Sequence, residues 1–380
     1  MAKSLFWLSI IAIVYTYAGY PAVVWLLARV SRRRVSRAEI TPRVSVVIAC
    51  HNEAKNIEAR IENLLALDYP EELLEVIVVS DGSSDLTAEA ARRARSGRVR
   101  VFSYEDRMGK AIALNVGVEI ASGEIIVFAD ARQRFDRLAL REIVANFNDE
   151  TVGAVSGELI VNASGSASVG EGVGLYWRYE KWIRKNESRC NSVIGATGAI
   201  YAIRRELWRP LPPMTILDDV YTPMRIALSG RRVVFEEKAL AYDEASETAS
   251  REFSRKVRTL TGNYQLCQLM PRLLLPTSGL IFQFHSHKLM RLLAPIFFLL
   301  LFAANLVIVA GPDRPLVYEA SLAAQLAFYC SVLAGGCLLK KNRKARLLNF
   351  VYVFSVMNAA ALVSLFYFVL GKRNVWVRSE

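Results

Sequence analysis

Four groups of polar residues carry the side chains suited to chemistry in this chain of 380 residues, and they recur in a fixed order between apolar segments. They are Asp81-Gly82-Ser83-Ser84-Asp85, Phe128-Ala129-Asp130-Ala131-Arg132, Leu217-Asp218-Asp219 and Arg255-Lys256-Val257-Arg258. The first two each end an apolar, strand-like run, which places carboxylates at the carboxyl ends of strands, where open α/β sheets bind ligands. The third offers a carboxylate pair for general-base work, and the fourth offers fixed positive charge for a diphosphate. These parts suit the breaking of a sugar–diphosphate bond beside a membrane.

Apolar runs that alternate with helix-like stretches must position the first two groups. Strands are expected at 44–49, 76–80, 99–102 and 124–129, with helices over a stretch ending at 67, over 87–95 and over 110–121. This order predicts a doubly wound, mostly parallel sheet. The GxGxxG and GxxxxGK[ST] patterns are absent from the sequence, which weighs against a dehydrogenase and a P-loop enzyme. Carboxylates at strand ends without a glycine loop suit a nucleotide that side chains read.

Apolar residues make up 53% of the chain and are concentrated in four uncharged blocks at 4–28, 292–312, 320–339 and 347–371. Each block is long enough to cross a bilayer. The first is too long for the apolar region of a signal peptide and lacks a small-residue cleavage site, so we expect it to stay as an anchor. The expected organisation is a transmembrane helix and basic linker (1–37), a catalytic domain (38–270), an interfacial helix (271–290) and three transmembrane helices (291–380).

The net charge of +12 is clustered beside these apolar blocks. One cluster is Arg29, Arg32, Arg33, Arg34 and Arg37, another is Lys340, Lys341, Arg343, Lys344 and Arg346, and a smaller one is Lys372, Arg373 and Arg378. By the positive-inside rule the first two face the cytoplasm, which predicts a multi-pass protein of the inner (plasma) membrane with a cytoplasmic catalytic domain. With four spans the third cluster faces outward, against the rule. We interpret the clusters as topology signals and lipid contacts, and expect no nucleic acid partner.

The stretch from Val44 to about Gln265 resembles the family 2 glycosyltransferases of GT-A fold, and its layout is similar to membrane-integrated cellulose, hyaluronan and poly-N-acetylglucosamine synthases. Six motifs carry the resemblance, in order and at compatible spacing: 46–53 (VVIACHNE), 78–85 (VVSDGSSD), 109–115 (GKAIALN), 130–132 (DAR), 195–199 (GATGA) and 217–219 (LDD). The resemblance implies a Rossmann-like GT-A domain inserted between transmembrane helices. It also implies inverting transfer from a UDP-sugar to a growing polysaccharide or lipid-linked acceptor, with polysaccharide export proteins as further partners.

On the donor side the resemblance assigns roles to individual residues. Glu53 and Asp81 match positions that hold the uridine, and Lys110 matches a residue beside the nucleotide. Asp130 matches the first carboxylate of the DxD signature, which implies a Mg²⁺ or Mn²⁺ cofactor with Asp130 as its ligand. Arg132 stands where that signature has its second aspartate, so the metal requirement stays open.

On the acceptor side, Asp219 matches the final carboxylate of the acceptor motif, the proposed catalytic base, with Asp218 beside it. The alternative is that both merely complement the dipole at the start of a helix. The loop that contains Gly195, Thr197 and Gly198 either lets an acceptor approach the backbone or forms a tight turn before the residues 199–203.

Two basic residues also have two interpretations each. Arg258 matches the arginine of QxxRW, which closes over the diphosphate, and otherwise belongs to a solvated basic helix face. Arg132 either binds phosphate through its planar guanidinium or lies on the surface. Arg255 and Thr259 replace the glutamine and tryptophan of QxxRW. The missing tryptophan keeps single-sugar transfer to polyprenyl phosphate open as an alternative, and Arg132 in the DxD position keeps an inactive membrane assembly subunit open.

Overall fold

The structure, a computed structural model, describes residues 1–31, 33–162, 167–244, 249–276, 279–312, 315–340 and 345–371. The chain divides into two compact units. An α/β unit comprises Val30–Asn162 and Arg184–Glu244, and a helical unit comprises Met1–Arg29, Ala163–Ile183 and Ala245–Glu380. The segment Ala163–Ile183 therefore belongs to the helical unit, although it lies within the interval 38–270 predicted as one catalytic domain.

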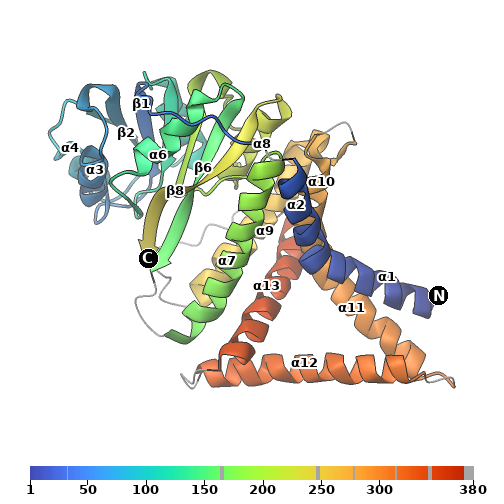
Figure 1. Cartoon of the computed structure of the whole chain (residues 1–380). Coiled ribbons are helices and arrows are strands. Elements are labelled where there is room, and N and C mark those ends of the chain that lie inside the picture. Colours follow the sequence, from blue (N-terminus) through green and yellow to red (C-terminus); the bar gives the residue numbers. More distant parts are fainter. Residues whose placement is uncertain are drawn as a thin grey trace. The chain divides into compact units, whose positions relative to one another are not determined.

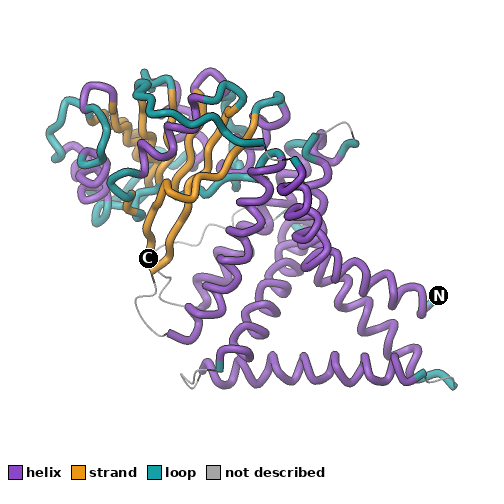
Figure 2. Tube along the Cα trace, in the orientation of Figure 1, coloured by secondary structure: helices purple, strands orange, loops and turns teal. Residues whose placement is uncertain are grey.

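The α/β unit is built on one sheet, whose eight strands in the described residues have the order β3-β2-β1-β4-β7-β6-β8-β5 (Figures 1 and 2). The strands are β1 (Val44–Cys50), β2 (Leu74–Asp81), β3 (Val99–Tyr104), β4 (Ile125–Ala129), β5 (Arg134–Phe135), β6 (Val152–Asn162), β7 (Ile200–Arg204) and β8 (Arg232–Glu244). Strands β3, β2, β1 and β4 are parallel, whereas β7 is antiparallel to both β4 and β6. The predicted mostly parallel sheet and its first four strands are confirmed.

The register of the parallel strands brings the predicted strand ends to one edge of the sheet. Cys50 at the end of β1 pairs with Ser80, and Ile48 pairs with Ala129 at the end of β4. Asp81 and Asp130 therefore follow neighbouring points on that edge. Strands β1 and β4 are almost wholly buried, which explains why they read as continuous apolar runs rather than alternating ones.

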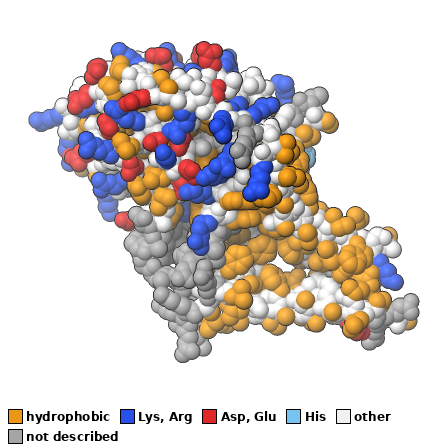
Figure 3. Space-filling model, in the orientation of Figure 1, with side chains coloured by type: hydrophobic (Ala, Val, Ile, Leu, Met, Phe, Trp, Pro, Cys, Tyr) orange, Lys and Arg blue, Asp and Glu red, His pale blue; other side chains and the backbone are white. Residues whose placement is uncertain are grey.

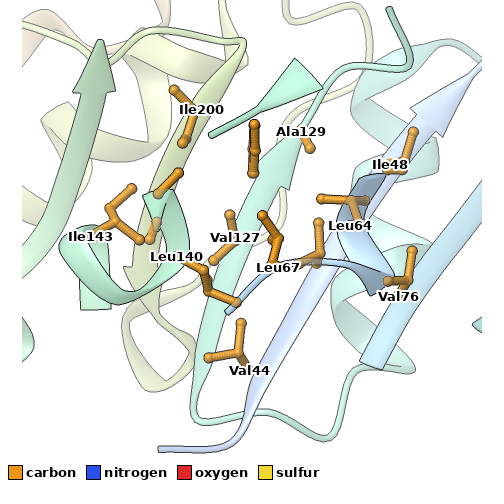
Figure 4. Close-up of a cluster of buried hydrophobic side chains, with 14 of the residues drawn as sticks. Val44, Ile48, Leu64, Leu67, Val76, Val127, Ala129, Leu140, Ile143 and Ile200 are labelled. Carbon is orange, nitrogen blue, oxygen red and sulfur yellow. The ribbon is translucent and has the colours of Figure 1, made fainter. Parts of the chain in front are cut away.

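Helices cover both faces of this sheet. Figure 4 shows the core on one face, where apolar side chains of the strands meet Leu64 and those of α6 (Ala139–Val144). Leu64 lies on α3 (Ile57–Leu65). On the other face α5 (Lys110–Glu119) packs so closely that a Cβ on Gly117 would lie 2.5 Å from Cγ1 of Val47. This close packing fixes the position of Lys110 at the start of α5. The α/β unit also contains a short helix between β2 and β3, α4 (Thr87–Arg92).

Four helical stretches in the described part of the helical unit are long and apolar enough to cross a membrane: Ala2–Val30, Ile281–Val309, Leu316–Leu338 and Leu347–Val369. They match the four blocks predicted from the sequence. The surface of this unit in Figure 3 is largely hydrophobic over α11 (Met290–Val309) and α12 (Leu316–Lys340). The third of the four stretches lies within α12, and the fourth lies within α13 (Arg346–Val369).

The other elements of the helical unit include irregular turns. The first stretch consists of α1 (Ala2–Val14), a π-helical turn (Tyr15–Gly19) and α2 (Tyr20–Val30). In the interval 271–290, predicted as an interfacial helix, the structure has a 3₁₀ turn (Pro271–Leu274), then α10 (Ile281–Gln283) and a second π-helical turn (Phe284–Leu289) that lead into α11. Of the basic clusters, Arg32, Lys341, Arg343, Lys344, Lys372, Arg373 and Arg378 lie outside the described residues.

A buried ion cluster ties α7 (Ala167–Cys190) to α11 within the helical unit. The Glu180 carboxylate pairs with Arg291 and lies 3.1 Å from Nε2 of His287. Burial alone would raise the pKa of Glu180, but Arg291 and His287 hold it well below its usual value. An ionised carboxylate among apolar helices is costly unless it is paired, so the three residues depend on one another.

Candidate active site

Asp81 at the end of β2 organises the segment that precedes α5. Its buried carboxylate accepts hydrogen bonds from the backbone N–H of Met108 (2.7 Å, Oδ1) and of Gly109 (2.9 Å, Oδ2). Gly82 has φ +56°, and a Cβ there would lie 2.4 Å from the backbone nitrogen of Arg107. Because Gly109 directly precedes α5, Asp81 helps to place Lys110. The predicted contact of Asp81 with a nucleotide stays a prediction.

The loops that follow β1 and β2 are hydrogen-bonded to each other. Asn52, at φ +56°, accepts a hydrogen bond from the Ser84 N–H (2.8 Å), and the Asp85 carboxylate accepts one from Ala54 (3.2 Å). Asp85 also accepts from the N–H of Thr87, the first residue of α4, two positions along the chain, as Asp side chains do in Asx turns. Glu53 lies between these contacts, half-buried, and its Oε2 accepts from the Asn56 amide (2.7 Å). Its uridine contact stays a prediction.

Lys110 brings the second and third groups of polar residues together. Its Nζ lies 3.1 Å from Oδ1 of Asp130 and 3.4 Å from Oδ1 of Asp218, although these carboxylates are far apart in the sequence. Burial alone would lower the pKa of Lys110, but Asp130, Asp218 and Asp219 raise it above its usual value. A single ammonium group therefore screens the mutual repulsion of three carboxylates.

Asp218 and Asp219 form the start of α8 (Asp218–Leu228), so they do occupy the first helical turn as the alternative interpretation held. Their environments differ. Asp218 is buried against Lys110, whereas Asp219 is only partly buried and its Oδ2 lies 2.9 Å from the position a Cβ would take on Gly198. Neighbouring side chains on a helix point in different directions. Asp219 is thus the more accessible of the two carboxylates.

The loop with Gly195, Thr197 and Gly198 packs against the start of α8. The Ala196 N–H donates to the backbone oxygen of Asp219 (2.7 Å), and Gly195 has φ +95° next to Val220. The Thr197 backbone oxygen accepts from the Ile200 N–H (3.0 Å), which turns the chain into β7. The loop is therefore a tight turn, and it also lies against Asp219. Acceptor binding by its residues stays a prediction.

Two buried side chains that the sequence analysis did not single out support the carboxylates. Tyr201 on β7 is fully buried and stacks on Phe128, with ring centroids 4.5 Å apart. Burial, followed by the charges of Asp218, Asp219 and Asp130, raises the pKa of Tyr201 well above its usual value, so its hydroxyl stays neutral. The sequence shows an apolar run at 199–203 but does not indicate that the Tyr201 ring would lie near the carboxylates.

Arg60 is the second such residue. It lies on α3, is almost completely buried, and donates from Nε to the backbone oxygen of Asp130 (3.1 Å). Its guanidinium carbon stacks 4.0 Å from the centre of the Phe135 ring. Burial lowers the pKa of Arg60 to about 9. Arg60 thus holds the backbone of the loop that carries Asp130 from the buried side, whereas Arg132 on the same loop is exposed.

The residues present fit a divalent cation in one way only. Among the residues that the structure describes, no group of three or more His, Cys, Asp or Glu side chains is placed to hold a metal. Asp130 is partly exposed and offers one carboxylate, and Mg²⁺ is commonly bound by one or two carboxylates together with substrate phosphates. A Mg²⁺ or Mn²⁺ ion thus fits at Asp130 when diphosphate oxygens complete its coordination.

Arg258 is the one predicted site residue outside the α/β unit. It lies on α9 (Ala249–Leu269), in the helical unit, where Val257 is buried. Nearby Lys256 lies 5.4 Å from the centre of the Trp177 ring, a cation–π contact between α9 and α7. The contact of Arg258 with a diphosphate stays a prediction.

Comparisons with known proteins show which proteins this chain resembles. Residues 45–209 match the family model described as Glycosyl transferase family 2. The chain is 26% identical over 231 residues to the poly-beta-1,6-N-acetyl-D-glucosamine synthase of Staphylococcus aureus (strain COL), which covers 59% of this chain and 55% of that protein. It is 25% identical over 228 residues to the synthase of the same name from Staphylococcus epidermidis, with the same coverage. The chain thus spans about half the length of these curated relatives.

Among solved structures, the chain is similar to the mannosyltransferase PcManGT from Pyrobaculum calidifontis, which was solved in complex with GDP-Man and Mn²⁺. The TM-score is 0.75 at 23% sequence identity, and the match covers 98% of this chain and 100% of that one. The likeness extends over the whole chain and confirms the predicted GT-A fold.

Proposed function

We propose that this chain, which carries a family 2 glycosyltransferase domain, is a membrane-bound inverting enzyme that transfers a sugar from a UDP-sugar to a growing polysaccharide or lipid-linked glycan. The observation that carries the proposal is the carboxylate cluster around Lys110. Asp130 follows a strand end, Asp218 begins α8, and both lie within 3.4 Å of the same ammonium group. The name of the staphylococcal relatives supports a polysaccharide product.

In this proposal Asp219 is the general base. Its carboxylate takes the proton from the acceptor hydroxyl as the hydroxyl oxygen attacks C1 of the sugar. The bond between C1 and the diphosphate oxygen breaks on the opposite face, so the configuration at C1 inverts. Asp218, buried and paired with Lys110, is not free to move, and it keeps the start of α8 in place beside Asp219.

The departing UDP carries developing negative charge, which the site must neutralise. Lys110 supplies a fixed ammonium group beside Asp130, and Arg132 supplies a guanidinium, which matches phosphate oxygens in a bidentate manner. Asp130 would hold Mg²⁺ or Mn²⁺. When bound, such an ion neutralises diphosphate charge as a Lewis acid. Lys110 and Arg132 would add positive charge beside the diphosphate, whereas Asp130 is the one carboxylate of the DxD signature present here to hold the ion.

One experiment tests the activity and its stereochemistry together. Purified protein in lipid nanodiscs is supplied with a panel of UDP-sugars and Mn²⁺, UDP release is measured, and the anomeric configuration of the product is read by NMR. We expect release with at least one donor and an inverted product. A retained configuration contradicts Asp219 as the base of a single displacement, and no release with any donor favours the inactive-subunit alternative.

Single-sugar transfer to polyprenyl phosphate is a second candidate. It is favoured by Thr259, which replaces the QxxRW tryptophan and is exposed on α9 with its hydroxyl bonded to the Arg255 backbone oxygen (3.0 Å). Product length separates the two candidates. A ladder of products from one acceptor supports elongation, and a single addition that requires a polyprenyl phosphate supports the second candidate.

We propose that the catalytic domain faces the cytoplasm, where nucleotide sugars are made, and that the segment 311–319, whose last four residues begin α12, is external. Single cysteine reporters at Ser96 and Asp313, in a background with Cys50, Cys190, Cys267, Cys330 and Cys337 replaced, test this orientation. An impermeant reagent should label only the Asp313 reporter in intact cells. Asp313 lies outside the described residues, so the expectation rests on charge placement. Labelling at Ser96 would invert the topology.

A further inference from the structure

Arg184, at the end of α7 that belongs to the α/β unit, is bonded to the loop beside the proposed base. Its NH1 group donates to the Thr197 hydroxyl (2.7 Å) and its NH2 group donates to the Ser156 hydroxyl (2.9 Å). NH2 also lies 3.4 Å from the backbone oxygen of Gly195. One guanidinium group therefore contacts both ends of the turn 195–197.

Ser156 reinforces this connection from the sheet. It lies on β6, is fully buried, and its hydroxyl accepts a hydrogen bond from the Thr197 backbone N–H (3.0 Å). Thr197 is thus held by its hydroxyl to Arg184 and by its backbone to Ser156. The ring of Phe235 lies 5.3 Å from the Arg184 guanidinium carbon and supports its plane.

The opposite side of the same loop lies against the start of α8. The Ala196 N–H donates to the backbone oxygen of Asp219, and Gly198 leaves room for the Asp219 carboxylate, since a Cβ there would lie 2.9 Å from Oδ2. The loop thus lies between two charged side chains that are far apart in the sequence: Arg184 on one side and Asp219 on the other. Movement of the loop must change what surrounds the Asp219 carboxylate.

The residue type matters for this arrangement. A guanidinium is planar and presents several donors in a fixed fork, so it can bond two hydroxyls and a carbonyl at once, whereas a lysine ammonium is a single point charge on a flexible stem. We propose that Arg184 is a positioning residue that holds the loop Gly195–Gly198 against Asp219, so that an acceptor hydroxyl rather than water receives the sugar. This inference rests on the proposed function, and in it Arg184 determines whether the sugar is transferred to an acceptor or to water.

The competing reaction is balanced in the same way as transfer. A water oxygen attacks C1, its proton passes to Asp219, and UDP leaves, which yields free sugar. A loop released from Arg184 no longer excludes water from Asp219 or presents the acceptor in line. A misplacement of about 1 Å can cost roughly 10²-fold in rate, so transfer should suffer far more than hydrolysis.

The test compares Arg184→Gln and Arg184→Lys with Arg189→Gln, an exposed arginine on the same helix, in full-length protein in nanodiscs. Transfer product and free sugar are quantified separately, and UDP affinity is measured by calorimetry. We expect Arg184→Gln to lower transfer by roughly 10²-fold, to raise the ratio of hydrolysis to transfer, and to leave UDP affinity within about twofold of wild type. Arg184→Lys should recover little of the transfer rate, and Arg189→Gln should behave as wild type.

Thr197→Val and Ser156→Ala each remove one hydroxyl and keep the test valid where the Arg184 variants fail to fold. Both should raise the hydrolysis ratio. The double variant Arg184→Gln/Thr197→Val should be no worse than its worse single variant, because the contact with the Thr197 hydroxyl is among those that Arg184→Gln already removes. An unchanged hydrolysis ratio in the folded variants, or additive losses in the double variant, would overturn the positioning role. Wild-type protein that neither transfers nor hydrolyses any UDP-sugar would instead overturn the proposed function, and this inference with it.

Discussion

Replacing Lys110 with methionine removes the one ammonium group that contacts both Asp130 and Asp218, while keeping a side chain of similar length. With an effective dielectric constant of about 20, opposite unit charges about 3 Å apart attract by roughly 5 kcal/mol before desolvation is subtracted. The Lys110 and Asp130 side chains are 24% and 37% exposed, so solvent screening reduces the net value to about 2 kcal/mol, within the range of a hydrogen bond between charged groups. In the donor complex, loss of the ammonium group leaves the diphosphate beside carboxylates whose negative charge is no longer compensated, and we expect a similar loss of binding free energy.

A loss of about 2 kcal/mol corresponds to a roughly 30-fold weaker affinity for UDP. Calorimetric titration of UDP into Lys110→Met protein with Mn²⁺ measures it, and a thermal melt confirms that the variant is folded. Lys55→Met is the matched control, because Lys55 is exposed in the segment before α3. Lys110→Arg should keep most of the affinity, since it keeps the charge. UDP affinity within twofold of wild type in folded Lys110→Met would refute the electrostatic role assigned to Lys110.

The remaining predictions concern the base, its loop and two partly buried carboxylates. Asp219→Asn should lower turnover by roughly 10²-fold or more with UDP affinity intact; near-normal turnover removes the base assignment. Gly198→Ala should lower transfer in a folded protein, because its Cβ would crowd Asp219 Oδ2 at 2.9 Å; an unaffected rate shows that the loop yields. Glu180→Gln should lower the free energy of unfolding, measured by melts, by about 3–5 kcal/mol, and a small loss contradicts the role assigned to the ion cluster. Burial raises the pKa of Glu75, but hydrogen bonds from Ser45 and Ser122 lower it below its usual value overall. The stabilisation by Glu75 is therefore present above about pH 4.3 and is lost as pH falls through the folded pKa. Glu75→Gln should make the melting temperature depend less on pH in the acid range, and an unchanged pH dependence rejects this prediction.

The sequence alone determined the elements that carry the site and the segments suited to a membrane. Runs such as Val44–Cys50 are apolar on both faces because parallel strands are buried on both faces, so their type and order can be read without a structure. Parallel strands must present their carboxyl ends at one edge, which is why Asp81 and Asp130 were expected together. Long uncharged blocks identify candidate spans for a similar reason, since length and apolarity are local properties.

The tertiary structure decided which side chains meet. Lys110, Asp130 and Asp218 come from three different elements, and Arg60, Arg184 and Tyr201 show no local pattern that marks them as neighbours of the site. The contact of Asp81 with a nucleotide stays a prediction, and the structure adds that its carboxylate accepts hydrogen bonds from the backbone of residues 108 and 109. Periodicity in the sequence reports which face of an element is buried, because burial repeats with the helical or strand period. Contacts between distant polar residues have no such period, so they are fixed only when the sheet and its helices pack.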